Sequence, residues 1–222
     1  MPPSGRRALG TAVLAVACMC ALAVLALLVA IRWDPLIHLD ARWVRSAHNA
    51  SLEHDWLEDG ARQVTQLGDP LVLYLVAAAA AIAVATRRQW ELAALIVVVR
   101  LGEVAINSFI KWVIDRPRPH FADPIISASG SAFPSGHAAG ATAVWGLFAL
   151  LVVRRTHGTA ARVGVLAGVG VVIAAIAATR VLLGVHYPSD ALGGILVGLS
   201  WLALCVYLFP QARLPVSGQR AS

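Results

Sequence analysis

Residues 163–190 are VGVLAGVGVVIAAIAATRVLLGVHYPSD, and this stretch decides the fold. From Val163 to Leu183 the only polar residues are Thr179 and Arg180. About 20 apolar residues are enough for a helix to cross the hydrocarbon core of a bilayer. The run therefore predicts a membrane-spanning helix, and the polar residues that follow it are expected at the membrane surface.

The composition extends this prediction to the whole chain. Of its 222 residues, 59% are hydrophobic and 14% are charged, and the mean hydropathy is +0.73. A soluble domain of this length cannot cover so much apolar surface. We therefore predict an all-α, polytopic integral membrane protein with a single domain over residues 1–222 and a transmembrane core over residues 9–209. Besides Val163–Leu183, the spanning helices are expected at Leu9–Ile31, Leu71–Thr86, Leu92–Ile110, Ala138–Val153 and Ala191–Phe209.

The formal net charge of +6 comes largely from basic residues in alternate connections between these helices. Under the positive-inside rule, such connections lie in the cytoplasm. The pattern predicts a plasma-membrane protein with cytoplasmic termini, an outward-facing site and no nucleic-acid partner. The basic residues are Arg6, Arg7, Arg87, Arg88, Arg154, Arg155, Arg162, Arg213 and Arg220.

The first connection, residues 32–70, is expected outside the cell and is long for a loop. Trp43, Leu52 and Trp56 are interleaved with charged residues at partly helical spacing. This predicts an interfacial helix with its tryptophans at the depth of the lipid headgroups. Two roles stay open for it: a lid that helps to admit lipid, or simple packing against the bundle. The histidines of this connection share no site pattern, so we interpret them as surface residues: His38, His48 and His54.

Lys111 and Arg118 lie at and just beyond the outer end of the third expected helix. The prolines of Asp115–Pro119 end that helix, because proline cannot continue the hydrogen-bond ladder. Arginine presents a planar fork to phosphate oxygens, and lysine acts as a point charge. Basic side chains at helix ends also reach simply for lipid headgroups, which would explain either cation alone. Arg116 stays open, because nonspecific contact with headgroup phosphate would explain it too.

Ser135, Gly136 and His137 open the fourth expected helix. Serine is an ordinary helix cap, and glycine allows a close backbone approach. The free amides of a helix N-terminus also form an anion-binding site. Local structure alone would explain Ser135 and Gly136, but not an ionisable His137 entering an apolar helix. An imidazole in this position suits a general acid.

Arg180, His186 and Asp190 follow the fifth expected helix. His186 and Asp190 are four residues apart, one helical turn if the sixth helix begins near Tyr187 and Pro188. A carboxylate near Nδ1 fixes the tautomer that leaves Nε2 free as a nucleophile, and it stabilises the cation formed on attack. A purely structural hydrogen bond would explain the same spacing.

The three elements together are much more specific than any one alone. Their order is Lys-x6-Arg-Pro, Pro-Ser-Gly-His and Thr-Arg-x5-His-x3-Asp. It resembles the signature of the phosphatidic acid phosphatase type 2 superfamily, membrane lipid phosphatases related to vanadium haloperoxidases and glucose-6-phosphatase. The motifs span Lys111 to Asp190, and the six-helix plan extends the resemblance to most of the chain. Thr179 stands where the family pattern has serine, and it keeps the hydroxyl.

The resemblance implies a metal-independent phosphatase that works through a phosphohistidine intermediate. It implies that His186 is the nucleophile, that Asp190 orients it and that His137 protonates the leaving oxygen. It assigns phosphate binding to Lys111, Arg118, Ser135, Gly136 and Arg180. The expected substrates and partners are membrane lipids: undecaprenyl diphosphate, phosphatidic acid or phosphatidylglycerophosphate. No cofactor is expected, and the sequence shows no carboxylate cluster suited to magnesium.

Two other functions fit parts of the pattern. A lipid-binding or transport protein would keep the fold without turnover, although an intact set of His137, His186 and Asp190 favours catalysis. A vanadate-dependent oxidant enzyme would have a similar site, but such enzymes are soluble, whereas this chain is predicted to span the membrane.

Arg100, Glu103 and Asn107 precede Lys111 at steps of three or four residues. This spacing places them near one stripe of the helix, facing the bundle interior. Two interpretations stay open: an internal Arg100–Glu103 ion pair that supports the fold, or a group that orients Lys111.

Overall fold

The computed structural model describes the backbone of residues 3–209 and the side chains of residues 9–209. Over this part the chain forms eight α-helices and one short 3-10 helix, η1, which confirms the all-α prediction. The helices are α1 Pro3–Ala30, α2 Asp34–Glu53, α3 Asp55–Thr65, η1 Gln66–Gly68, α4 Pro70–Ala85, α5 Trp90–Ile114, α6 Gly136–Arg155, α7 Thr159–Leu182 and α8 Pro188–Leu208. Four of the basic residues that enter the topology argument lie outside the described side chains: Arg6, Arg7, Arg213 and Arg220.

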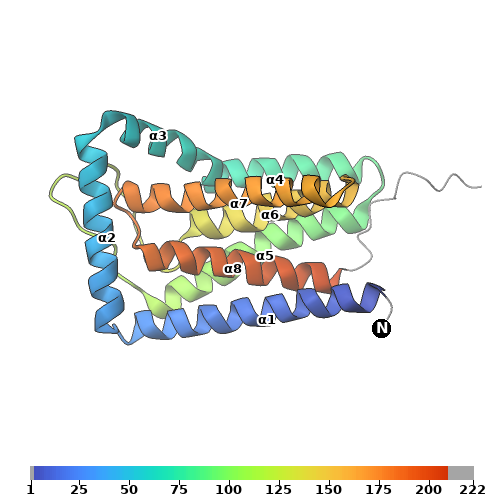
Figure 1. Ribbon diagram of the computed structural model, residues 1–222, viewed down its shortest axis with the longest axis horizontal. Coiled ribbons are helices and arrows are strands. Elements are labelled where there is room, and N and C mark those ends of the chain that lie inside the picture. Colours follow the sequence, from blue (N-terminus) through green and yellow to red (C-terminus); the bar gives the residue numbers. More distant parts are fainter. Residues whose placement is uncertain (1–2, 210–222) are drawn as a thin grey trace, which may run out of the picture.

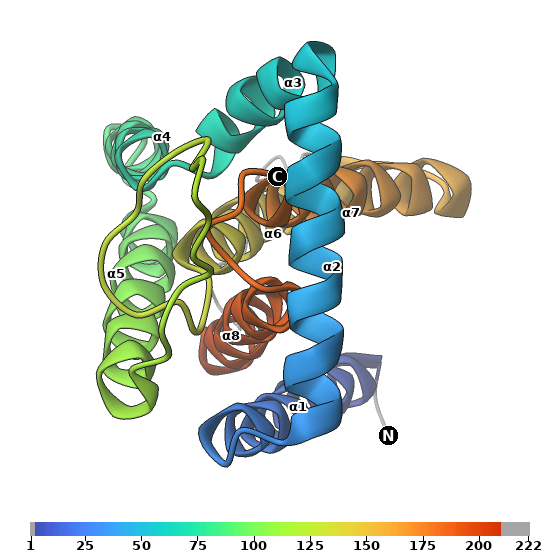
Figure 2. The same cartoon turned by 90° about the vertical axis from the view of Figure 1, so that its left-hand side faces the viewer.

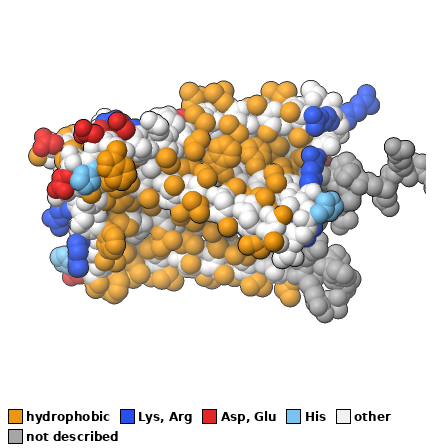
Figure 3. Space-filling model, turned by 45° about the horizontal axis from the view of Figure 1, so that its top comes forward, with side chains coloured by type: hydrophobic (Ala, Val, Ile, Leu, Met, Phe, Trp, Pro, Cys, Tyr) orange, Lys and Arg blue, Asp and Glu red, His pale blue; other side chains and the backbone are white. Residues whose placement is uncertain are grey.

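Six segments of the described chain are long and apolar enough to cross a membrane, as the sequence predicts. They run alongside one another as a bundle, with α2 lying across one end (Figure 1). Hydrophobic side chains cover the middle of the bundle surface, and acidic side chains gather at the α2 end (Figure 3). The spans are Leu9–Ala30, Asp55–Ala85, Trp90–Ile114, Gly136–Arg155, Thr159–Leu182 and Pro188–Leu208.

Two helix ends differ from their predicted positions in ways that shape the site. α5 continues past Ile110 to Ile114, so Lys111 lies inside its last turn. The chain leaves this helix through Asp115, whose φ of 41° is left-handed. α8 begins at Pro188, three residues before the predicted span at Ala191 but at the start that the spacing of His186 and Asp190 requires, and Asp190 therefore lies in the first turn. Proline is favoured there, because the amide it lacks would have no partner within the helix.

α2 confirms the predicted interfacial helix. It crosses the end of the bundle and packs on α7 and α8 (Figure 2). Trp43 is 60% exposed on its outer side, as expected for an anchor at the headgroup level. The inner side carries four buried residues spaced by three or four positions: Asp40, Val44, His48 and Ser51.

The interpretation of His48 as a surface residue is wrong. Its side chain is buried and stacks on Phe121 with ring centroids 3.8 Å apart. Its Nε2 lies 3.1 Å from the carbonyl oxygen of Asp123, a hydrogen-bonding distance. The residue faces inward because α2 lies over the loop between α5 and α6, a contact between segments distant in sequence that no local pattern reveals.

Small residues allow α6 and α8 to approach closely beside the site. A Cβ placed on Gly194 of α8 would overlap the carbonyl oxygen of Ser135 and lie 2.9 Å from Cβ of Ala138. Only glycine leaves room for this contact, which sets the first turn of α6 against the first two turns of α8.

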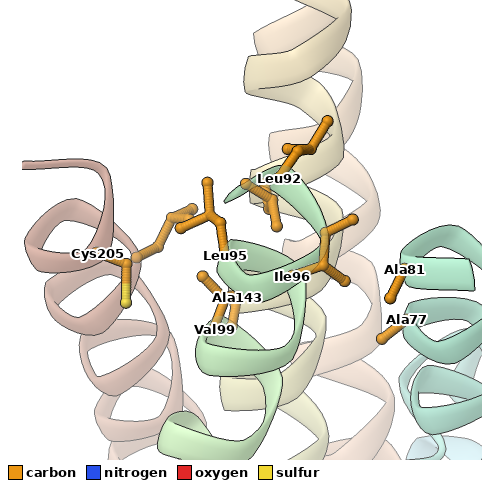
Figure 4. Close-up of a cluster of buried hydrophobic side chains, with 10 residues drawn as sticks. Ala77, Ala81, Leu92, Leu95, Ile96, Val99, Ala143 and Cys205 are labelled. Atoms are coloured by element: carbon orange, nitrogen blue, oxygen red, sulfur yellow. The ribbon is translucent and has the colours of Figure 1, made fainter. Parts of the chain in front are cut away.

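The opposite half of the bundle is closed by apolar side chains from α4, α5, α6 and α8, and Figure 4 shows this cluster. The buried face of α5 is apolar as far as Val99 and polar from Arg100 onward. Nη1 of Arg100 lies 2.5 Å from Oε2 of Glu103, and the guanidinium also stacks 4.0 Å from the ring centroid of Tyr74. The internal ion pair predicted for this stripe is therefore confirmed.

Candidate active site

The predicted site residues come together at the end of the bundle that α2 covers. The C-terminal ends of α5 and α7 carry Lys111 and Arg180, and the N-terminal ends of α6 and α8 carry His137 and Asp190. The backbone N–H of Ser135 donates a 2.9 Å hydrogen bond to the carbonyl oxygen of Asp190, which joins the second motif to the third. Nη1 of Arg118 donates a 2.8 Å bond to the carbonyl oxygen of Val185, which joins the first to the third.

A tight turn between α7 and α8 presents His186. The backbone N–H groups of Val185 and His186 both donate to the carbonyl oxygen of Arg180, closing the end of α7. Gly184 lies in this turn with a φ of +72°, and a Cβ there would lie 2.8 Å from Nδ1 of His48. The turn therefore requires glycine both for its backbone conformation and for its packing.

Asp190 lies one turn after His186 and faces it. Its Oδ2 accepts a 2.8 Å hydrogen bond from the backbone N–H of Tyr187, which caps α8. The same oxygen lies 3.6 Å from Nδ1 of His186, an ion-pair distance slightly longer than a hydrogen bond. The other oxygen, Oδ1, accepts a 2.6 Å hydrogen bond from Nη1 of Arg116. The carboxylate is thus fixed on two sides and open toward the imidazole.

The hydrogen bonding around His186 selects one tautomer. Nη1 of Arg118 lies 3.2 Å from Nε2, and because a guanidinium can only donate, Nε2 must carry the lone pair. The proton of the neutral ring is then on Nδ1, toward Asp190. A lone pair on Nε2 beside a cation is the arrangement that a nucleophilic imidazole needs to attack an anionic substrate.

The imidazole of His186 is held neutral by its surroundings. Burial lowers the pKa of His186 from 6.5 to about 4, and the cations Arg118 and Lys111 act in the same direction. Asp190 opposes the shift but does not cancel it. At neutral pH the ring therefore carries its lone pair without needing to lose a proton first.

The three cations of the motifs point into the same region. Nζ of Lys111 donates a 2.6 Å hydrogen bond to the carbonyl oxygen of Ser131, and Nε of Arg118 donates a 3.0 Å bond to that of Gly130. Nη1 of Arg180 donates a 2.7 Å bond to Oγ1 of Thr65, from α3. Such bonds to neutral oxygens are weaker than bonds to an anion, so a phosphate would compete for the same donors.

The start of α6 completes the site. The side chains of Ser135 and Asn107 are buried, and Oγ of Ser135 and Nδ2 of Asn107 have no hydrogen-bond partner within the described chain. His137 is half-buried, and its electrostatic neighbours include Arg180, His186 and Asp69. A phosphate seated at this helix N-terminus would meet free amides and unsatisfied polar atoms.

Sequence reasoning missed Asp40 and left the role of Arg116 open. Instead of facing lipid headgroups, Arg116 is buried with Nη1 on Asp190 and Nη2 2.8 Å from Oδ2 of Asp40. Burial acts to lower the pKa of Arg116, but the two carboxylates outweigh it and raise the pKa above its ordinary value. The only sign of Asp40 in the sequence is its helical spacing with Val44, His48 and Ser51, and this spacing does not identify the partner of Asp40.

No group of three or more His, Cys, Asp and Glu side chains that could hold a metal ion is present within the described residues. The groups described above are cations, imidazoles, the carboxylate of Asp190 that faces an imidazole, and the carboxylate of Asp40 that is paired with Arg116. These residues suit an anion such as phosphate.

A helical bundle built to cross a membrane, with imidazoles and cations gathered at one end, defines a membrane enzyme that acts on phosphate esters. A sequence model of the PAP2 superfamily matches residues 91–214, more than half of the chain. The chain therefore belongs to the PAP2 superfamily, the phosphatidic acid phosphatase type 2 group that its motifs resemble.

Named relatives agree with this assignment. The chain is 32% identical to phosphatidylglycerophosphatase B of Bacillus subtilis (strain 168) over 152 residues, which are 67% of this chain and 73% of the relative. It resembles the crystal structure of a transmembrane PAP2-type phosphatidylglycerolphosphate phosphatase from Bacillus subtilis with a TM-score of 0.76 and 27% identity, covering 86% of this chain and 94% of that one. It resembles Aquifex aeolicus LpxE in fold, with a TM-score of 0.60 and 20% identity over 76% of this chain and 94% of that one.

These similarities confirm three predictions made from the sequence. The protein is a multi-pass membrane protein, its fold is that of transmembrane PAP2 phosphatases, and it is a lipid phosphate phosphatase.

Proposed function

We propose that this phosphatase removes the phosphate of a lipid phosphomonoester, of the phosphatidylglycerophosphate type, through a phosphohistidine intermediate. Nε2 of His186 attacks phosphorus, and the bond from phosphorus to the lipid oxygen breaks. His137 gives its proton to that leaving oxygen. Water then attacks the phosphohistidine while His137 takes a proton from it, which releases inorganic phosphate and restores His186.

The observation that carries this proposal is the placement of the two ring nitrogens of His186 between Arg118 and Asp190. Its Nε2 accepts from Arg118, while Nδ1 faces Asp190. When Nε2 bonds to phosphorus, the ring becomes cationic, and a carboxylate at Nδ1 stabilises that charge. His137 is near enough to be coupled electrostatically to His186, as a general acid on the same substrate must be.

Fixed positive charge supplies the remaining stabilisation. We assign phosphate binding to Lys111, Arg118 and Arg180 together with Ser135 and Gly136 at the start of α6. Phosphoryl transfer places charge on the nonbridging oxygens, so cations and helix amides already in position lower its barrier. The mechanism uses no metal, since the acid, the nucleophile and the charge stabilisation are all assigned to side chains and backbone amides of the protein.

The substrate class rests on the named relatives and on where the site lies. The curated relative and the crystal structure from Bacillus subtilis both carry names that describe action on phosphatidylglycerophosphate. The site lies at the end of the membrane spans, where a headgroup phosphate enters while the acyl chains stay in the hydrocarbon layer. Undecaprenyl diphosphate is the competing substrate.

We also propose that the site faces outward. Arg87 and Arg88 in the α4–α5 connection, and Arg154 and Arg155 in the last turn of α6, lie at the end opposite α2. The positive-inside rule assigns that end to the cytoplasm. Single cysteines at Asn49 and His157, in a variant without native cysteines, test this with a membrane-impermeant maleimide on intact cells. Labelling only at position 49 supports the orientation, and labelling only at position 157 reverses it.

The enzymatic test is a substrate panel on purified protein with a chelator present. Wild type, His186→Ala and the control His157→Ala, which changes an exposed histidine at the far end, are given phosphatidylglycerophosphate, phosphatidic acid and undecaprenyl diphosphate. We expect phosphate release from the first substrate by wild type and His157→Ala only. Release by His186→Ala would remove His186 as the nucleophile, and faster release from undecaprenyl diphosphate would overturn the substrate assignment.

A further inference from the structure

A chain of buried charges connects α2 with the proposed catalytic carboxylate. Nη2 of Arg116 pairs with Asp40 at 2.8 Å, and Nη1 of the same guanidinium pairs with Asp190 at 2.6 Å. The three side chains are at most 7% exposed. We define Asp40, Arg116, Ser189 and Asp190 as the bracing network.

Ser189 closes this network on itself. Its hydroxyl donates a short hydrogen bond to Oδ2 of Asp40 and accepts a 2.7 Å bond from Nη1 of Arg116. Its backbone N–H donates a 3.0 Å bond to Oδ1 of Asp40. Because this amide belongs to the first turn of α8, Asp40 also supplies a negative charge to that helix N-terminus.

Both terminal nitrogens of Arg116 are engaged in these contacts. One face of its guanidinium lies 4.2 Å from the ring centroid of Tyr187, and its edge donates to two carboxylates and a hydroxyl. Its backbone is fixed as well, because its N–H donates to Oγ of Ser131 and its carbonyl accepts from the N–H of Ala132. A substrate phosphate would have to displace a carboxylate to reach this cation. Arg116 is therefore distinct from the cations assigned to phosphate.

We propose that Arg116 and Asp40 are positioning residues, which hold the Asp190 carboxylate in the orientation that presents Nε2 of His186 to phosphorus. This inference rests on the proposed function. Removing Arg116 frees Oδ1 of Asp190, and removing the charge of Asp40 frees the other edge of Arg116. In either case the carboxylate facing Nδ1 of His186 can rotate or shift, and nucleophilic attack slows without loss of phosphate binding.

Charge arithmetic provides variants that separate positioning from stability. Asp40, Arg116 and Asp190 together carry one net negative charge. Arg116→Gln leaves two buried carboxylates without their cation and is expected to impair folding. Adding Asp40→Asn to Arg116→Gln restores the original net charge but not the contact to Asp190. The double variant is therefore expected to recover stability without recovering the rate of attack.

The experiment mixes each enzyme with phosphatidylglycerophosphate that carries a radiolabelled terminal phosphate, and quenches within milliseconds. The amplitude of the unfolding transition of each variant counts the folded sites, and the rate constant at which excess enzyme consumes the labelled lipid in a single turnover reports attack by His186. We expect Arg116→Gln to lower the rate constant ~100-fold and Asp40→Asn about 10-fold. The double variant should regain amplitude and keep the ~100-fold slower rate constant. KM should stay near the wild-type value throughout.

The matched control is the less buried ion pair of α3, Glu58 with Arg62, whose side chains are 27% and 44% exposed. Nη2 of Arg62 also donates a 2.8 Å hydrogen bond to the carbonyl oxygen of Ile125, so Glu58→Gln is the cleaner of the two single variants. Glu58→Gln, Arg62→Gln and their double variant are expected to keep both the amplitude and the rate constant. If the rate constant of Asp40→Asn/Arg116→Gln recovers together with its amplitude, the network is only structural and the inference is wrong. If Arg116→Gln does not fold, this double variant and Asp40→Asn still decide the question. If wild type releases phosphate without ever carrying label, the proposed phosphohistidine mechanism fails first.

Discussion

Gly194→Ala tests whether the close contact between α6 and α8 positions the site. A Cβ on Gly194 would lie 2.9 Å from Cβ of Ala138 and would also overlap the carbonyl oxygen of Ser135. Carbon atoms in contact prefer a separation of about 3.5–4.0 Å, so the first turn of α6 must move by roughly 0.5–1 Å. Neither neighbour is the flexible end of a side chain, so the backbone must move.

The expected loss can be derived from two opposing effects. Alanine replaces glycine inside a helix, which by itself stabilises by about 0.5–1 kcal/mol. Overpacking costs about 1–3 kcal/mol, so the net destabilisation should lie between about 0 and 2.5 kcal/mol, near 1 kcal/mol at the middle of both ranges. A shift of this size at Ser135 also displaces the proposed phosphate site and should lower kcat about 10- to 100-fold.

Gly168→Ala supplies the matched control, because a Cβ at that position on α7 meets nothing within 4 Å. Thermal unfolding in detergent micelles, followed by tryptophan fluorescence, and phosphate release are measured for both variants. Gly168→Ala should be as stable as wild type or slightly more stable, with full activity. If Gly194→Ala behaves in the same way, α6 and α8 are not in the contact described. If it loses stability but keeps kcat, that contact does not position Ser135.

Three further predictions concern charged groups. Asp190→Asn should lower kcat ~10⁴-fold, because an amide no longer fixes the tautomer or stabilises the cation of His186, and steady-state phosphate release measures this. Glu103→Gln should destabilise the protein by about 3–5 kcal/mol in chemical unfolding, because Arg100 keeps a buried charge without its partner. Between pH 6.5 and about 4 the folded state binds fewer protons at His186 than the unfolded state does. The free energy of unfolding therefore falls as the pH is lowered from 6.5 to about 4, by about 3 kcal/mol in total at 1.36 kcal/mol per pH unit. Unfolding titrations of His186→Ala should lack this pH dependence.

The spans and the motif chemistry were predictable because their signals are local. A run of apolar residues marks a helix in the bilayer wherever it occurs, and the four-residue spacing of His186 and Asp190 places them on one turn. The resemblance to the family then predicts that the three motifs between Lys111 and Asp190 form one site. The helix ends near Lys111 and Pro188 were off by a few residues, because capping and turn geometry decide them.

The bracing network could not be predicted because its contacts are distant in sequence. Asp40 and Arg116 are 76 positions apart, and neither motif spacing nor hydropathy links them. In the sequence, Asp40 cannot be told apart from the exposed acidic residues of the first connection. Only the orientation of α2 about its own axis shows that Asp40 faces inward. His48 was misplaced for the same reason, because its partners Phe121 and Asp123 lie in the loop between α5 and α6.

The same contacts favour one of the two roles left open for α2. Lifting it as a lid would separate Asp40 from Arg116 and Ser189 and leave a buried charge partly unpaired. Breaking a buried ion pair typically costs about 3–5 kcal/mol, which would limit the lifted state to roughly one molecule in a hundred or fewer. His48 would lose its stacking on Phe121 in the same movement. We infer that α2 works as a fixed brace over the site, and that a lipid phosphate reaches His186 while Asp40 stays in place.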